Sequence, residues 1–198
     1  MGILGLLFAL LLPGIAAIRR SADRNLTRQQ MSGIEAAMQG FLTEYGRFPL
    51  QIRDPSTGRI GPLQLSPAWD SRDTYGLRNE LRLFGSNVTN PEGPRQGYID
   101  LIRSLRGLNA EDNPRGTIFL NVSDSYIVED QYLDPWDHRY GVVADWNMDG
   151  NVDVGVGHGT VTNRVVAIWS WARGATTATG STNAREDPEG HLKSWTTE

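Results

Sequence analysis

The sequence has no cysteine among its 198 residues. Disulfide bonds and thiolate metal sites are therefore excluded, and an exported protein of this kind would rely on packing, on a bound ion or on assembly with other chains. Basic residues are not in excess either, since 19 lysines and arginines against 23 acidic residues give a formal net charge of −4. This overall balance gives no reason to expect a nucleic-acid partner, which would require a clustered basic surface.

Motifs of known catalytic chemistry are missing as well. The chain has no P-loop, no GxSxG and no HExxH segment. Gly157–Thr160 reads GHGT, which is similar to the histidine segment of subtilisin-like proteases, but no GTSMA nucleophile segment follows and the chain is too short for that fold. His138 and His191 have no ligand partners nearby in the sequence. We therefore expect no enzymatic activity.

The strongest feature present is an apolar run near the N-terminus. Ile3–Ile18 is sixteen residues without a charge, and Arg19 and Arg20 follow at once. The run is shorter than the roughly 20 residues that span a bilayer as a helix, and its basic pair lies on the wrong side for a cleaved signal peptide. A helix that is apolar on every side is not stable in water. The run therefore favours a membrane or assembly segment.

The pattern becomes amphipathic behind the two arginines. Gly33 and Gly40 weaken a helix in this region without ending it, whereas Gly46 and Pro49 do end it. Apolar residues recur before that end at spacings of three and four, which places them on one face: Met31, Ile34, Met38, Phe41 and Tyr45.

These patterns predict one long helix over residues 3–45. Pro13 is expected to bend its front half, because proline removes a backbone donor and crowds the preceding turn. We divide the chain into an apolar N-terminal segment, residues 1–20, and a globular domain, residues 21–198, that includes the rear half of the helix.

The region that follows has few regular patterns. Gln51–Asn90 is rich in glycine, proline and serine, and is predicted to be a long loop with one helical stretch at Tyr75–Phe84. Gly97–Gly107 is predicted to be a short helix with four apolar residues on one side: Tyr98, Ile99, Ile102 and Leu105.

From Thr117 onward, β-branched and aromatic runs alternate with turn residues. The runs are TIFL (117–120), SYIV (125–128), RYGVVAD (139–145), NVDVGV (151–156) and RVVAIWSW (164–171). Their close spacing predicts an antiparallel meander packed on the long helix, which makes an α+β fold. Trp136 is expected to be a core anchor because of its large apolar body. Trp169, Trp171 and Trp195 are expected to be core anchors too, or one of them faces a neighbouring subunit.

One acidic segment, DWNMDGNVD, has two interpretations. In a calcium loop, oxygen ligands stand at alternate positions with a glycine at the sixth, and a bidentate glutamate at the twelfth. Four residues match that pattern, whereas Val156 stands at the twelfth position: Asp145, Asn147, Asp149 and Asp153. In the other interpretation, Asp149-Gly150 forms the tight turn of a hairpin between RYGVVAD and NVDVGV. Both stay open, because an ion can bind at a hairpin tip.

Several strings resemble the type IV pilin-like family, and in particular the major pseudopilin of type II secretion. GILGLLFALLLPGIAAI (2–18) is similar to part of the N-terminal pilin helix, including its proline, and IEAAMQGFLTEYGRFP (34–49) resembles the end of that helix. NPRGTIFL, YLDPWDHRYGVVAD and VVAIWSWARG resemble strands and turns of the same family. The resemblance covers most of the chain, with the DPWxxxY string as its most specific part, and it is weakest over Gln51–Pro94.

The resemblance implies a pilin-like fold and a structural role. It predicts a single-pass protein of the bacterial inner membrane, with its globular domain in the periplasm, that assembles with copies of itself, other pseudopilins and secretion-system assembly proteins. The filament would support protein export across the outer membrane, although filaments for twitching or DNA uptake share the same helix. The expected filament and membrane contacts are Ile3, Leu4, Leu7, Phe8, Leu11, Pro13, Ile15 and Ile18.

Two departures from the family pattern accompany the resemblance. Aligned on Pro13, Met1 falls about nine residues inside the mature helix of the family, and those residues would lengthen the apolar run to about 25. Near the calcium site of the family, Arg173 stands where an aspartate is expected, and only Glu186 and Asp187 preserve acidity there. The aspartate string and the tryptophans support an alternative function, an exported calcium-dependent module that binds carbohydrate or protein without filament assembly.

Overall fold

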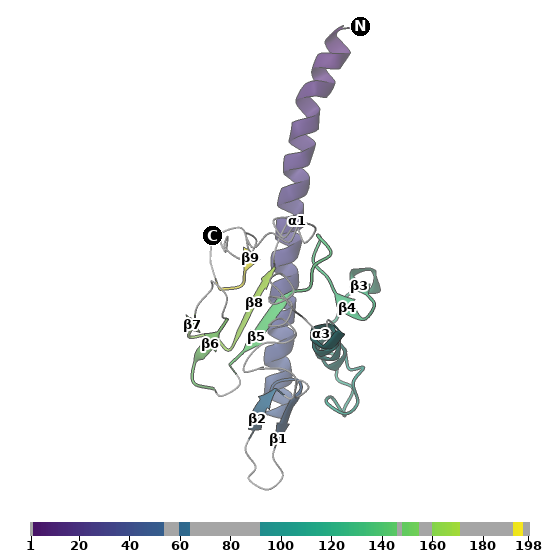
Figure 1. Cartoon of the computed structure of the whole chain (residues 1–198). Helices are drawn as coiled ribbons and strands as arrows, with labels where there is room; N and C mark the ends of the chain where they lie inside the picture. Colours follow the sequence, from purple (N-terminus) through teal and green to yellow (C-terminus); the bar gives the residue numbers. More distant parts are fainter. Residues whose placement is uncertain are drawn as a thin grey trace.

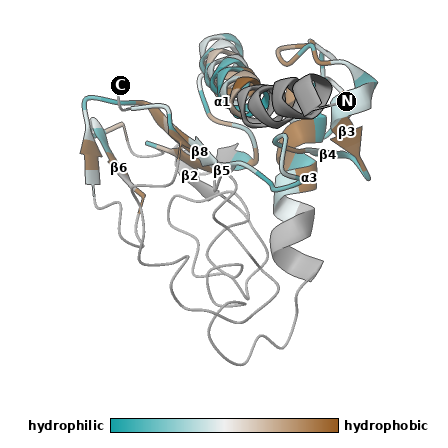
Figure 2. Ribbon diagram, turned by 90° about the horizontal axis from the view of Figure 1, so that it is seen from above, coloured by the Kyte–Doolittle hydropathy of each residue, from teal (hydrophilic) through white to brown (hydrophobic). Residues whose placement is uncertain are grey.

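The computed structural model describes residues 2–53, 60–63, 92–145, 148–154, 160–170 and 192–195. One long helix lies alongside small antiparallel sheets, so the α+β class is confirmed (Figure 1). The helix α1 (Gly2–Tyr45) lies over the sheet that contains β5 (Gly141–Ala144) and β8 (Val166–Ser170). It also lies over a second helix, α3 (Glu92–Leu105), which is beside that sheet (Figure 2).

Helix α1 spans Gly2–Tyr45, which confirms the prediction of one helix to within a residue. It passes through Pro13 without interruption. It ends because Gly46 adopts a positive φ of 64° while its N–H donates to the carbonyl of Leu42 at 2.8 Å. Of the five residues predicted on its apolar face, Tyr45 is half-buried and the other four are at most 2% exposed.

The main sheet has the order β5 (Gly141–Ala144), β8 (Val166–Ser170), β9 (Leu192–Lys193). Alternate residues of the central strand β8 point to opposite faces. Val166 and Ile168 belong to the core beneath α1, whereas Ala167 and Trp169 pack with the buried valines on the other face. This is why all five residues of β8 are buried.

The predicted meander is wrong, because β5 pairs with β8 and not with the next strand in sequence. Strands β6 (Asn151–Asp153) and β7 (Thr160–Thr162) form their own antiparallel pair. Two backbone hydrogen bonds link the two pairs, from Asp145 N to Val165 O at 2.9 Å and from Asn163 N to Gly150 O at 2.8 Å. The two pairs therefore form one long antiparallel ladder, which is interrupted on one side between Asp145 and Gly150.

Helix α3 spans Glu92–Leu105, so the predicted helix at 97–107 is present but begins earlier. Its core residues are Tyr98, Leu101, Ile102 and Leu105, all at most 1% exposed, while Ile99 is half-buried. The strand predicted at 117–120 is wrong. Phe119 N and Leu120 N both donate to Leu105 O at 2.9 Å, so this segment closes the end of α3 and forms no strand within the described part of the chain.

The remaining elements are short. A 3-10 turn, Asp124–Tyr126, leads into β3 (Ile127–Val128), which pairs with β4 (Gln131–Tyr132), so only the second half of SYIV is a strand. The region predicted as a long loop begins with a two-stranded sheet, β1 (Gln51–Arg53) and β2 (Ile60–Leu63). The helical stretch predicted at Tyr75–Phe84 lies outside the described residues.

Candidate functional site

The aspartate segment forms a loop that is closed by its own first residue. Asp145 is 4% exposed, and its carboxylate accepts hydrogen bonds from the backbone N–H groups of Asp149 at 3.1 Å and Gly150 at 2.7 Å. Met148 and Gly150 adopt positive φ angles, of 58° and 82°, which turn the chain sharply. The buried carboxylate thus holds the backbone between β5 and β6 in place through these two hydrogen bonds.

This geometry overturns the hairpin interpretation. Asp149-Gly150 is not the turn between two paired strands, because β5 pairs with β8 and β6 with β7. Asp149 Oδ1 instead accepts from Asn151 N at 2.7 Å.

The structure leaves the calcium interpretation as a prediction. The contact between Asp145 and Asp149 joins the backbone N–H of Asp149 to the Asp145 carboxylate, so it does not test whether the two carboxylates share an ion. Among the residues whose placement is described, no group of three or more acidic or histidine side chains is arranged to hold a metal ion. The other predicted ligands lie outside that set, in whole or in their side chains: Asn147, Asp153, Glu186 and Asp187.

A second buried carboxylate, which the sequence interpretation missed, belongs to Asp134 of the DPW turn. Its Oδ1 accepts from the backbone N–H groups of Trp136 and His138, each at 2.9 Å, and its Oδ2 accepts from Ser170 Oγ at 2.5 Å. Burial raises the pKa of Asp134, while these hydrogen bonds and the nearby His138 oppose that shift. Asp134 therefore anchors the turn to the end of β8.

The tryptophans only partly follow the prediction. Trp169 is a core anchor, 1% exposed, and its ring lies so close to Gly141 that a Cβ there would overlap it. Trp195 packs edge-on against Trp169, with ring centroids 6.3 Å apart. Trp136 is half-buried, and Trp171 lies outside the described residues.

Buried tyrosine hydroxyls join the elements around α1. Tyr140 on the approach to β5 donates to Gln30 of α1, and Tyr98 of α3 donates to the carbonyl of Tyr132 at 2.7 Å. Burial raises the pKa of both Tyr98 and Tyr140 far above the ordinary tyrosine value. These hydroxyls stay protonated and act as structural donors.

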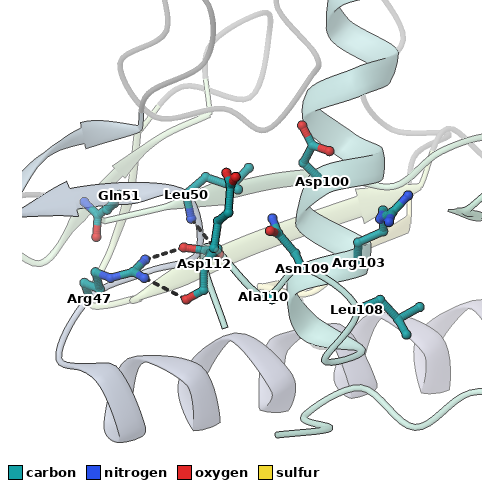
Figure 3. A pocket seen from close by; sticks show the side chains of 10 residues that line it. Arg47, Leu50, Gln51, Asp100, Arg103, Leu108, Asn109, Ala110 and Asp112 are labelled. Atoms are coloured by element: carbon teal, nitrogen blue, oxygen red, sulfur yellow. Dashed lines mark hydrogen bonds and ion pairs between the residues drawn. The ribbon is translucent and has the colours of Figure 1, made fainter. Parts of the chain in front are cut away.

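A polar groove of about 700 Å³ lies between the segment that follows α1 and the loop after α3 (Figure 3). Asp112 dominates it, because its carboxylate pairs with the Arg47 guanidinium at 2.5 Å and accepts from Leu50 N at 3.0 Å. Tyr45 OH also donates to Asn113 Oδ1 at 2.6 Å. The ion pair of Arg47 and Asp112 therefore holds the chain after α1 in place.

The exposure of α1 changes along its length. Residues 17–22 are all exposed, with Ile18 at 71%, whereas Thr27, Gln30 and Met31 are buried. Figure 1 shows the N-terminal part of α1 projecting beyond the rest of the chain. Over the residues that the structure describes, no helix combines the length and apolar character needed to cross a bilayer.

Searches against family models, curated proteins and solved structures found no match to this chain. What the protein does is therefore inferred from its own residues.

Proposed function

We propose that this protein is a pilin-like structural subunit of a type II secretion filament, or of a related type IV pilus-like filament. It would carry out no chemistry. One observation supports this proposal above all: a single continuous helix has its rear half buried under its own domain and its front half projecting away from it.

The rear half is part of the folded domain. Met31, Ile34, Met38 and Phe41 are each at most 2% exposed, and they pack against β8 and α3. An ion pair at 3.2 Å between Glu35 and Arg164 adds a polar contact to the segment that leads into β8. The rear half is therefore anchored in the folded domain, and the rest of the helix extends from it (Figure 1).

The front half supports assembly. At 1.5 Å per residue, the 44 residues of α1 measure about 66 Å, and the first side chain of α1 that is fully buried among the described ones is Thr27. The sequence of Ile3–Ile18 is entirely apolar. Covering such a helix with lipid or with other helices stabilises it by about 25 cal/mol per Å².

The proposed cycle follows from these two halves. Before assembly, the front half would be held in the bacterial inner membrane with the globular domain in the periplasm. During assembly the front halves would leave the lipid and pack against one another in the filament core, with copies of the chain and other pseudopilins as neighbours. The growing filament would then push exported proteins toward the outer membrane.

The absence of cysteine allows a direct test by cross-linking. Full-length Ile18→Cys protein is released from detergent in the presence of a bifunctional maleimide, and Ile34→Cys serves as the matched control because Ile34 is fully buried. We expect ladders of cross-linked chains, and filaments by electron microscopy, from Ile18→Cys alone. A freely monomeric chain in sedimentation, with residues 3–18 folded back on its own domain, would overturn the proposal.

A further inference from the structure

Directly after the apolar run, α1 carries a strip of exposed arginines: Arg19, Arg20 and Arg24. Between residues 19 and 28 there are four arginines and one aspartate, a net charge of +3. Since the whole chain carries −4, all the other residues together carry −7. This short stretch of helix thus carries a net positive charge, whereas the rest of the chain is net negative.

The strip has the dimensions of a lipid headgroup layer. Arg19 and Arg24 lie about 7.5 Å apart along the axis, from the helical rise. One headgroup layer is about 5–7.5 Å thick, since a bilayer measures about 40–45 Å with its headgroups and about 30 Å without them. Arg20 and Arg24 are one turn apart and lie on the same side of the helix. On the N-terminal side, the exposed Ile18 continues the apolar run.

We propose that Arg19, Arg20 and Arg24 bind the phosphates of anionic lipids and so set the depth and orientation of α1 at the membrane surface. This inference rests on the proposed membrane-anchored subunit. Guanidinium groups bind phosphate oxygens through paired hydrogen bonds, and each basic residue near an anionic surface adds to the attraction. The remaining charge of −7 is repelled by the same surface, which holds the globular domain away from it.

An acidic surface on a second copy of the chain is the competing partner. Two of the exposed acidic residues already pair with arginines of their own chain, Asp124 with Arg106 at 2.6 Å and Asp130 with Arg103 at 3.3 Å. The arginine strip, in contrast, adjoins an apolar run of sixteen residues. Lipid is therefore the favoured partner, because it can contact the arginine strip and the adjoining apolar run together.

The test measures flotation of the full-length chain with vesicles of phosphatidylcholine alone or with added phosphatidylglycerol. On the anionic vesicles at low salt, the double variant Arg20→Gln/Arg24→Gln is expected to bind about 25-fold more weakly than the unchanged chain, about fivefold for each arginine. Arg20→Lys/Arg24→Lys should retain most of the binding. Arg115→Gln removes one exposed positive charge from the loop after α3, where its side chain is 68% exposed, and should bind as the unchanged chain does.

The possible results separate the inference from the proposed function. Equal binding of all variants to both kinds of vesicle would overturn the lipid contact while leaving the anchor intact. Binding to neither kind would overturn both. Loss of self-association in Arg20→Gln/Arg24→Gln by sedimentation, with vesicle binding unchanged, would assign the strip to contacts between copies. Selective loss on the anionic vesicles, suppressed by high salt, would establish the lipid contact.

Discussion

The front and rear halves of α1 belong to one helix but have opposite surroundings. In the rear half, Phe41 is fully buried and its ring lies 4.6 Å from that of Tyr45 and 5.3 Å from that of Phe119. In the front half, Ile18 is 71% exposed. The two residues are comparable in apolar character, so their burial is decided by whether the folded domain reaches that level of the helix.

This difference shows what each half contributes. An apolar residue that its own domain covers stabilises the fold, whereas an exposed one contributes to stability only when another molecule covers it. Removing side chains from the two halves should therefore have separable effects on folding and on assembly.

The largest expected effect is that of Phe41→Ala on the free energy of unfolding. Truncating a fully buried phenylalanine leaves a cavity beside Tyr45 and Phe119 and costs about 3–5 kcal/mol. Urea unfolding measures this loss, and Ile18→Ala is the control, with an expected change below about 0.5 kcal/mol. Self-association of the full-length chain, measured by sedimentation after release from detergent, should respond the other way, with Ile18→Ala reducing it. Equal destabilisation by both variants would show that the front half is also covered by the domain.

Arg47 tests how the rear half is held at its end. Arg47→Ala leaves the carboxylate of Asp112 buried without its cation, and the expected destabilisation is about 2–3 kcal/mol. Arg115→Ala also breaks an ion pair, with Glu44, but at an exposed position where such pairs contribute about 0–1 kcal/mol. Thermal unfolding of both variants compares the two contacts. If they lose the same stability, the buried pair does not hold the end of α1.

Asp134 should make the free energy of unfolding depend on pH, whereas the exposed charges of the front half should not. Because its pKa is raised in the folded state, the native protein binds this proton more tightly than the unfolded chain does. Stability from this group is thus present below about pH 4 and is lost as the pH rises through the raised pKa. Relative to Asp134→Asn, the unchanged protein should become less stable over that range in urea titrations.

Arg24→Gln is the control for that experiment, since it removes an exposed charge and leaves the buried carboxyl of Asp134 untouched, so its stability difference from the unchanged protein should not vary with pH. Parallel stability curves for the unchanged protein and Asp134→Asn would show that the carboxyl group ionises equally easily in the folded and unfolded chains.

The smallest effect concerns the Asp145 loop, which lies on the sheet and not on either half of α1. Because Val156 replaces the bidentate glutamate, calcium is expected to bind with a dissociation constant on the order of a millimolar. Calorimetry should show a small heat that Asp149→Ala abolishes and that Glu111→Gln, an exposed change in the loop after α3, retains. Equal heats from all three proteins would remove the site.

Prediction from the sequence succeeded where local spacing decides the structure. The apolar repeat from Met31 to Tyr45 and the break at Gly46 both act within one or two turns, and both are confirmed. It failed at TIFL, whose β-branched and aromatic residues suit a strand. There, Phe119 packs on Phe41 and Tyr45, and its backbone caps α3.

The candidate sites show the same limit. The aspartates of the calcium pattern can be recognised from spacing alone, but the backbone donors that occupy the Asp145 carboxylate cannot. The role of Asp134 could be anticipated only in part from the sequence. An aspartate before proline often accepts a hydrogen bond from the N–H two residues on. Its third partner, Ser170, is 36 residues away and could not be identified from the sequence.

By itself, the sequence determined that a long helix forms, which of its faces is apolar behind the arginines and where it ends, because helical hydrogen bonds and side-chain spacing are local. Only the tertiary structure decided that β5 pairs with β8, that Gly141 must lack a side chain beneath Trp169, and that Asp134 is buried. Those features depend on contacts between residues far apart in the chain, and such partners are chosen by packing in three dimensions and not by the order of neighbouring residues.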